Sequence, residues 1–96
     1  MSSSLTSFQD TLVTLYVENT DYEMFGEKHV YGLHKKADEA IRGNPGPMIF
    51  WLLEYKDSDW FNMSEFQEIF SDSEKIKRLA MEMKNADDAA QYVDLD

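Results

Sequence analysis

The five residues Gly43–Pro47 (GNPGP) interrupt the chain near its midpoint and limit what can fold on either side of them. Gly43 suits the left-handed backbone conformation that commonly follows the last turn of a helix. Pro45 prevents that helix from continuing, whereas Pro47 fits the start of a new helix. The sequence therefore predicts one helix that ends before Gly43 and another that begins at Pro47.

Two helical segments are expected before this break. Apolar residues at helical spacing predict a first helix over about residues 4–19, with a strand as the alternative. The motif Thr20–Glu23 (TDYE) has the form of a capping box and predicts the start of a second helix. Residues 21–42 are then expected as one imperfect helix or as two parts separated near Gly26. The main alternative is a short β-hairpin near residues 22–33, which would make the fold α+β.

Three further helical segments are expected after the break. The run PMIFWLLEYK is apolar nearly all the way round, which is typical of a helix in the middle of a core. Ser64 followed by Gln67 has the pattern of a second capping box. The last long helix would carry Asp87 on its apolar face, so it is expected to end near Asn85, with Asp87 capping a short terminal turn.

The chain has 96 residues, of which 43% are hydrophobic, and this is enough for one domain with one core. We predict an all-α, compact single-domain bundle of four to five helices over residues 1–96, with frayed ends at 1–3 and 93–96. The absence of cysteine excludes disulfides and thiolate metal sites.

No segment of the sequence has the pattern of a secretory signal or a membrane span. The longest apolar run, Met48–Leu53, is far shorter than the roughly 20 residues that a membrane helix needs. We therefore expect the protein in the cytoplasm, which could be the cytoplasm of an infected host cell.

Charge is the main compositional signal. Nineteen acids and nine bases give a formal net charge of −10, and residues 49–96 hold twelve of the acids and five of the bases. A surface of this kind repels phosphate backbones and anionic membranes, whereas it can attract a basic protein. We expect a basic protein partner, with neither direct nucleic-acid binding nor membrane binding. The alternative is that the acidity only keeps the protein in solution.

The stretch Lys56–Phe70 (KDSDWFNMSEFQEIF) alternates carboxylates with large aromatic residues and carries the candidate site. Three acids at spacings of i, i+3 and i+7 would lie on one side of a helix, just after two further acids and a tryptophan at a corner. The candidate partner-binding residues are Asp57, Asp59, Trp60, Glu65, Glu68 and Asp72. Charge would speed encounter with a basic partner and an exposed ring would add affinity. The alternative is that Trp60 and Phe61 plug the core.

The sequence patterns for a calcium site or a histidine metal site are weaker. Counted from Asp57, twelve residues resemble the calcium loop of EF-hand proteins, with carboxylates at positions 1, 3, 9 and 12. They depart from that family at Phe61, which offers no side-chain oxygen, and at Asn62, where glycine is expected. His29 and His34 would lie about 140° apart on a helix and cannot share a metal from one face. His34 is expected to be half-buried in the core. We expect no cofactor, no metal and no enzymatic activity.

These observations predict a small protein that binds and inhibits or modulates a basic protein, such as a nucleic-acid-binding protein. In size and charge the chain is similar to phage-encoded counter-defence proteins and DNA mimics as a class. The bases Lys75, Lys77 and Arg78 depart from a faithful DNA mimic, because they interrupt its negative surface. The alternatives are a structural or adaptor subunit that forms a helical homo-oligomer, such as a homodimer, and a degenerate calcium binder.

Overall fold

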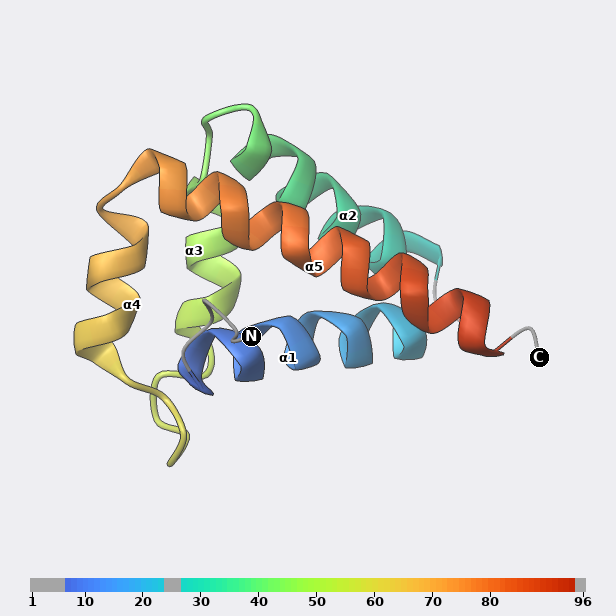
Figure 1. Ribbon diagram of the computed structural model, residues 1–96, viewed down its shortest axis with the longest axis horizontal. Coiled ribbons are helices and arrows are strands. Elements are labelled where there is room, and N and C mark those ends of the chain that lie inside the picture. Colours follow the sequence, from blue (N-terminus) through green and yellow to red (C-terminus); the bar gives the residue numbers. More distant parts are fainter. Residues whose placement is uncertain (1–6, 24–26, 95–96) are drawn as a thin grey trace.

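The computed structural model describes residues 7–23 and 27–94, with side chains placed at residues 7–20 and 32–90. These residues form five α-helices and no strand (Figure 1). The helices are α1 (Ser7–Glu23), α2 (Glu27–Ile41), α3 (Gly46–Leu53), α4 (Met63–Phe70) and α5 (Ser73–Asp94). The prediction of a compact all-α bundle is confirmed.

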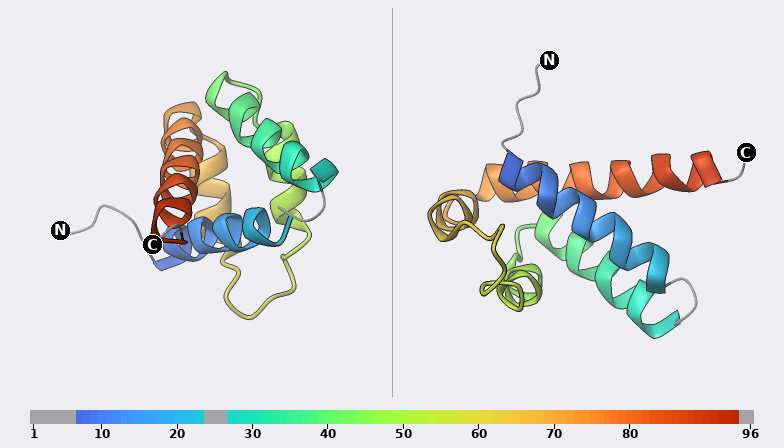
Figure 2. Two further views of the ribbon diagram at one scale, coloured as in Figure 1. Left: turned by 90° about the vertical axis from the view of Figure 1, so that its right-hand side faces the viewer. Right: turned by 90° about the horizontal axis from the view of Figure 1, so that it is seen from below.

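Three long helices form the body of the molecule. α5 packs against both α1 and α2, and α1 also packs against α2 (Figures 1 and 2). The short helices α3 and α4 lie at one end, where α3 packs on α2 and α4 packs on α5. The connection between α3 and α4, residues 54–62, protrudes at this same end, away from the C-terminal end of α5 (Figure 1).

One hydrophobic core receives side chains from all five helices. Its buried members are Phe8, Leu12, Tyr16, Leu33, Ala37, Ala40, Met48, Leu52, Phe66, Ile69, Ile76, Leu79, Ala80 and Met83. Of the helices in the described ranges, none combines the length and apolar character needed to cross a lipid bilayer.

The boundary between the first two helices differs from the prediction. α1 continues through Thr20 to Glu23, so the predicted capping box is wrong. The Thr20 hydroxyl is buried inside the bundle, where its one proton lies within hydrogen-bond reach of both the Val17 carbonyl and Asp87, and it therefore does not cap a helix. The expected break near Gly26 lies outside the described residues. Residues 22–23 and 27–33 are helical, which contradicts the hairpin alternative.

The helix after the proline break is less buried than expected. Pro47 lies in the first turn of α3, as predicted, although the helix begins one residue earlier, at Gly46; only one face of it is buried. Met48 and Leu52 are buried, whereas Phe50 is 74% exposed. The reason is position, because α3 lies at the end of the bundle and not in its middle.

The start of α4 is two residues earlier than expected. The Asn62 side chain accepts a hydrogen bond from the Glu65 amide at 3.1 Å, and its amide group donates to the Glu65 carboxylate at 3.2 Å. The first bond caps α4, for which the extended backbone of Asn62 is suited, and the second joins the two side chains. The prediction that Ser64 caps α4 is therefore wrong.

The last helix is continuous from Ser73 to Asp94, so the expected end near Asn85 is wrong. Asp87 lies inside α5, with 1% of its surface exposed, and does not cap a terminal turn. Its burial is compensated by partners on α1 and α2, which the sequence pattern does not reveal. Of the predicted frayed ends, residues 93–94 belong to α5, and residues 1–3 and 95–96 lie outside the described residues.

Gly43 has a φ of +102°, as predicted for the residue that follows α2. We expect Gly43→Ala to lower the free energy of unfolding by about 1–2 kcal/mol, because an L-residue is strained in this conformation. A Cβ at Gly43 would meet no atom within 4 Å, so the loss would come from the backbone alone. Urea denaturation measures it, with Gly46→Ala as the control, since Gly46 has no positive φ. Equal losses at the two positions would contradict this explanation.

Candidate protein-interaction surface

Negative charge is concentrated at the end of the molecule that carries α3 and α4. We call residues 54–74 the acidic end; they form the α3–α4 connection, α4 and the start of α5. This segment holds seven acids and one base, a formal charge of −6 (1 − 7) out of the total of −10. The acids are Glu54, Asp57, Asp59, Glu65, Glu68, Asp72 and Glu74, and the base is Lys56.

The two acids of the protruding connection are the most available. Asp57 and Asp59 are exposed, and neither side chain forms a hydrogen bond or ion pair within the described part of the chain. The backbone around them is held by two successive turns, in which Ser58 bonds to the Tyr55 carbonyl at 3.0 Å and Phe61 bonds to the Ser58 carbonyl at 3.1 Å. These carboxylates are therefore presented on an ordered turn, and no ion pair within the described residues neutralises them.

Trp60 is both a packing residue and an exposed ring. Its ring centroid lies 6.4 Å from Phe8, 6.0 Å from Tyr55 and 5.8 Å from Phe61, so three aromatic neighbours hold it in place. It still keeps 37% of its surface exposed. Phe61 instead packs edge-on against Phe8 and contacts Phe66, as expected for a residue that plugs the core. Trp60 thus supplies a fixed, partly exposed aromatic surface beside the two free carboxylates.

The three remaining candidate acids do not lie on one helix as predicted. Glu65 and Glu68 belong to α4, but Asp72 follows α4 and caps α5 by accepting a hydrogen bond from the Glu74 amide at 2.9 Å. The Glu65 carboxylate accepts a hydrogen bond from the Asn62 side-chain amide at 3.2 Å, and Glu68 pairs with Lys75 at 3.0 Å. All three contribute negative charge to the acidic end, but each also has a local structural contact.

The resemblance to a calcium loop finds no support in this geometry. α4 begins at Met63, inside the twelve-residue pattern, so Glu65 and Glu68 are fixed on a helix and cannot wrap around an ion with Asp57 and Asp59. Among the described residues, no group of three or more histidines or acids is arranged to hold a metal. The side chain of His29 is not among those that the structure describes.

A second polar cluster, which the sequence reasoning missed, joins α1, α2 and α5. Buried Asp87 accepts a hydrogen bond from Thr20, and its second oxygen lies 3.5 Å from Nε2 of His34. The other nitrogen of His34 is hydrogen-bonded to the Tyr16 hydroxyl at 2.9 Å. The sequence contained an indication of this cluster, because both His34 and Asp87 fall on apolar stripes. Since Tyr16, Thr20 and Asp87 are buried, we interpret the cluster as a structural junction.

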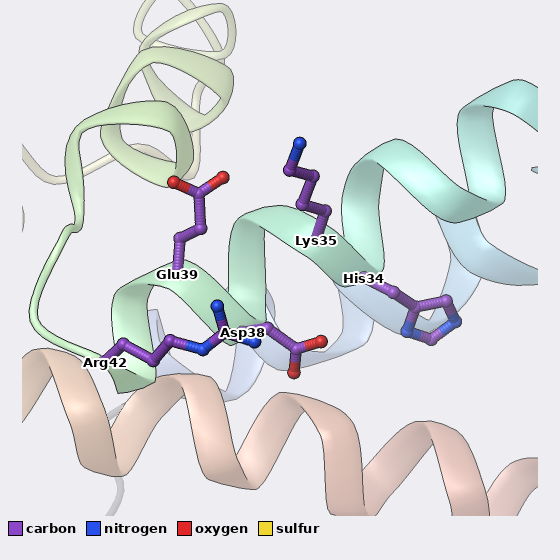
Figure 3. A pocket seen from close by; sticks show the side chains of 5 residues that line it. All are labelled: His34, Lys35, Asp38, Glu39 and Arg42. Carbon is purple, nitrogen blue, oxygen red and sulfur yellow. The ribbon is translucent and has the colours of Figure 1, made fainter.

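An open pocket of about 440 Å³ lies beside this junction, lined by His34, Lys35, Asp38, Glu39 and Arg42 (Figure 3). Asp38 and Arg42 extend along α5, whereas Lys35 and Glu39 point the other way. Asp38 is paired with Lys84 of α5. The lining charges balance, and all five residues are at least partly exposed, so the pocket defines no particular ligand.

We compared the chain with models of protein families, with curated protein sequences and with solved structures, and none of them matches it.

Proposed function

We propose that this chain is a small acidic protein without catalytic activity that binds a basic protein through its acidic end and inhibits or modulates that protein. The observation that carries the proposal is the formal charge of −6 gathered at one end of the molecule. Exposed Asp57 and Asp59 and the partly exposed Trp60 lie together within this end.

The proposed mode of binding uses charge for encounter and the aromatic ring for affinity. A concentrated patch of one sign attracts an oppositely charged surface over roughly 10 Å at 0.1 M salt. On contact, Trp60 can bury an already ordered ring against the partner, which costs little conformational entropy. Such rings are common among the residues that dominate binding energy.

Inhibition would follow if the covered surface is the partner's nucleic-acid site. The same lysines and arginines cannot neutralise phosphates and these carboxylates at once, so the two ligands compete. We propose that this inhibition takes place in the cytoplasm. The cytoplasm of an infected host cell is one such place, as for counter-defence proteins. Docking is favoured over full mimicry of DNA, because Glu68 is paired with Lys75, Glu65 is hydrogen-bonded to Asn62, and Asp72 caps α5.

The test is capture of a partner by the immobilised chain from an extract of its native host, with washes at low and high salt. We expect the native chain to capture a basic protein that is retained at low salt and released at high salt. The variant Asp57→Lys/Asp59→Lys is expected not to capture this protein. These two positions suit the test because their side chains form no contact that the fold needs. Helical circular dichroism should therefore be unchanged. Asp72 is unsuitable because its replacement would also remove the cap of α5, and Glu65 is unsuitable because its carboxylate is hydrogen-bonded to the capping residue Asn62.

The matched control is Glu18→Lys/Asp88→Lys, which makes the same change in net charge at exposed positions on α1 and α5, outside the acidic end. This variant should still capture the partner. The proposal fails if Asp57→Lys/Asp59→Lys captures as well as the native chain. It also fails if the control variant loses capture equally, because net charge alone would then explain binding.

A further inference from the structure

Positive charge is also unevenly placed in this acidic protein. Seven of the nine bases lie in residues 35–42 and 75–84, which hold only three acids, so these two segments together carry a formal charge of +4 (7 − 3). The acidic end, which lies between them in sequence, carries −6. The molecule therefore has two regions of opposite sign.

Three of these seven bases, Arg42, Lys77 and Lys84, belong to the part of the molecule where α2 and α5 pack together. These helices run in opposite directions and pack against each other (Figures 1 and 2), and the ion pair between Lys84 and Asp38 joins them. Lys77 lies two helical turns before Lys84, on the same side of α5, and Arg42 lies one turn beyond Asp38. Because the directions are opposed, Arg42 and Lys77 are at the same end of the contact. We call Arg42, Lys77, Met81 and Lys84 the basic seam.

Two of the three bases in the basic seam are unpartnered in the described part of the chain, whereas Lys84 is paired with Asp38. The side chains of Arg42 and Lys77 form no hydrogen bond or ion pair there. Met81, which lies between Lys77 and Lys84 along this side of α5, is 52% exposed. The seam thus combines free cations with an exposed apolar side chain, which is the complement of the acidic end with its free carboxylates and exposed Trp60 and Met63.

We propose that the basic seam of one copy binds the acidic end of a second copy. The two surfaces differ and lie on different helices, so the contact is head-to-tail, and each bound copy leaves one seam and one acidic end open. The net charge of −10 opposes this association at very low salt. Near 0.1 M salt, repulsion beyond roughly 10 Å is screened, whereas charges in close contact are screened much less. A basic partner would compete with self-association, because both would use the acidic end.

The test is sedimentation velocity over a range of protein concentrations at moderate salt. The native chain is expected to show an average mass that exceeds the monomer and rises with concentration, and that returns to the monomer at high salt. Asp57→Lys/Asp59→Lys and Arg42→Glu/Lys77→Glu are each expected to remain monomeric. An equimolar mixture of these two variants should form a 1:1 dimer that does not grow, because the first keeps its seam and the second keeps its acidic end.

Three results would overturn the inference: a monomeric native chain at all salt concentrations, association that survives either variant, or a mixture that stays monomeric. The seam variant also separates this inference from the proposed function. If Arg42→Glu/Lys77→Glu still captures the basic partner while the native chain does not self-associate, only the further inference is lost. If self-association holds and no basic partner is captured, only the proposed function is lost.

Discussion

Replacing Asp87 with alanine is expected to lower the free energy of unfolding by about 2–4 kcal/mol, whereas Asp88→Ala should change it by less than about 0.5 kcal/mol. Asp87 is 1% exposed and is bonded to Thr20 on α1 and close to His34 on α2, while its neighbour Asp88 is exposed. Loss of the carboxylate would remove the contact that joins three helices and would leave a gap in their shared interior.

The size of the loss is limited by what remains bonded. Without Asp87, the Thr20 hydroxyl still donates to the Val17 carbonyl at 2.8 Å, and His34 keeps its bond to Tyr16 at 2.9 Å. Neither group is left as a buried charge, so we do not expect the chain to unfold. Thr20→Val, which keeps the shape but removes the donor, should also be destabilising, because the buried carboxylate then loses its hydroxyl partner.

Urea denaturation followed by circular dichroism measures these differences, with Asp87→Asn as the intermediate variant. The asparagine oxygen can still accept from Thr20, so its loss should be smaller than that of alanine. A double variant, Thr20→Val/Asp87→Leu, should be more stable than the sum of the single losses predicts, because it leaves neither group unsatisfied. If Asp87→Ala is as stable as Asp88→Ala, the junction does not hold the three helices together.

The junction also shows why the sequence predicted the fold class but not all helix ends. Gly43, Pro45 and Pro47 act on the backbone next to them, and their effects were predicted correctly. Thr20 and Asp87 are 67 residues apart, and the role of each depends on the other. Taken locally, a threonine before a glutamate indicates a cap, and an aspartate on an apolar stripe indicates a helix end. Both interpretations were wrong because a long-range hydrogen bond overrides the local pattern.

The candidate surface, like the helix ends, was predicted only in part from the sequence. Its acids are close in sequence, so their gathering at one end of the molecule follows from the short connection between α3 and α4. Their local contacts do not follow from the sequence. Asn62 and Ser64 are both suitable caps, and the extended backbone at Asn62 decides between them. With Asn62 as the cap, its side chain also bonds to the Glu65 carboxylate, whereas Asp57 and Asp59 have no side-chain partner in the described part of the chain.

The second large effect is expected in α3, where sequence alone gives Leu52 and Phe50 the same environment. Leu52→Ala should lower the free energy of unfolding by about 2–5 kcal/mol, because Leu52 is fully buried and its truncation leaves a cavity. Phe50→Ala should change it by less than about 0.5 kcal/mol, since the Phe50 ring is 74% exposed. Alanine is a better helix former than either residue, so a loss at Leu52 would reflect packing and not helix propensity.

Urea denaturation of the two variants is compared with that of the native chain, and Phe50→Ala serves as the control for Leu52→Ala within the same helix. The expected pattern is a large fall in the midpoint for Leu52→Ala with an unchanged slope, and a midpoint close to the native value for Phe50→Ala. Similar losses at both positions would mean that α3 is buried on two faces, as its apolar sequence suggests, and would place it inside the bundle. A loss confined to Leu52 would confirm that α3 closes one end of the core and leaves Phe50 at the surface.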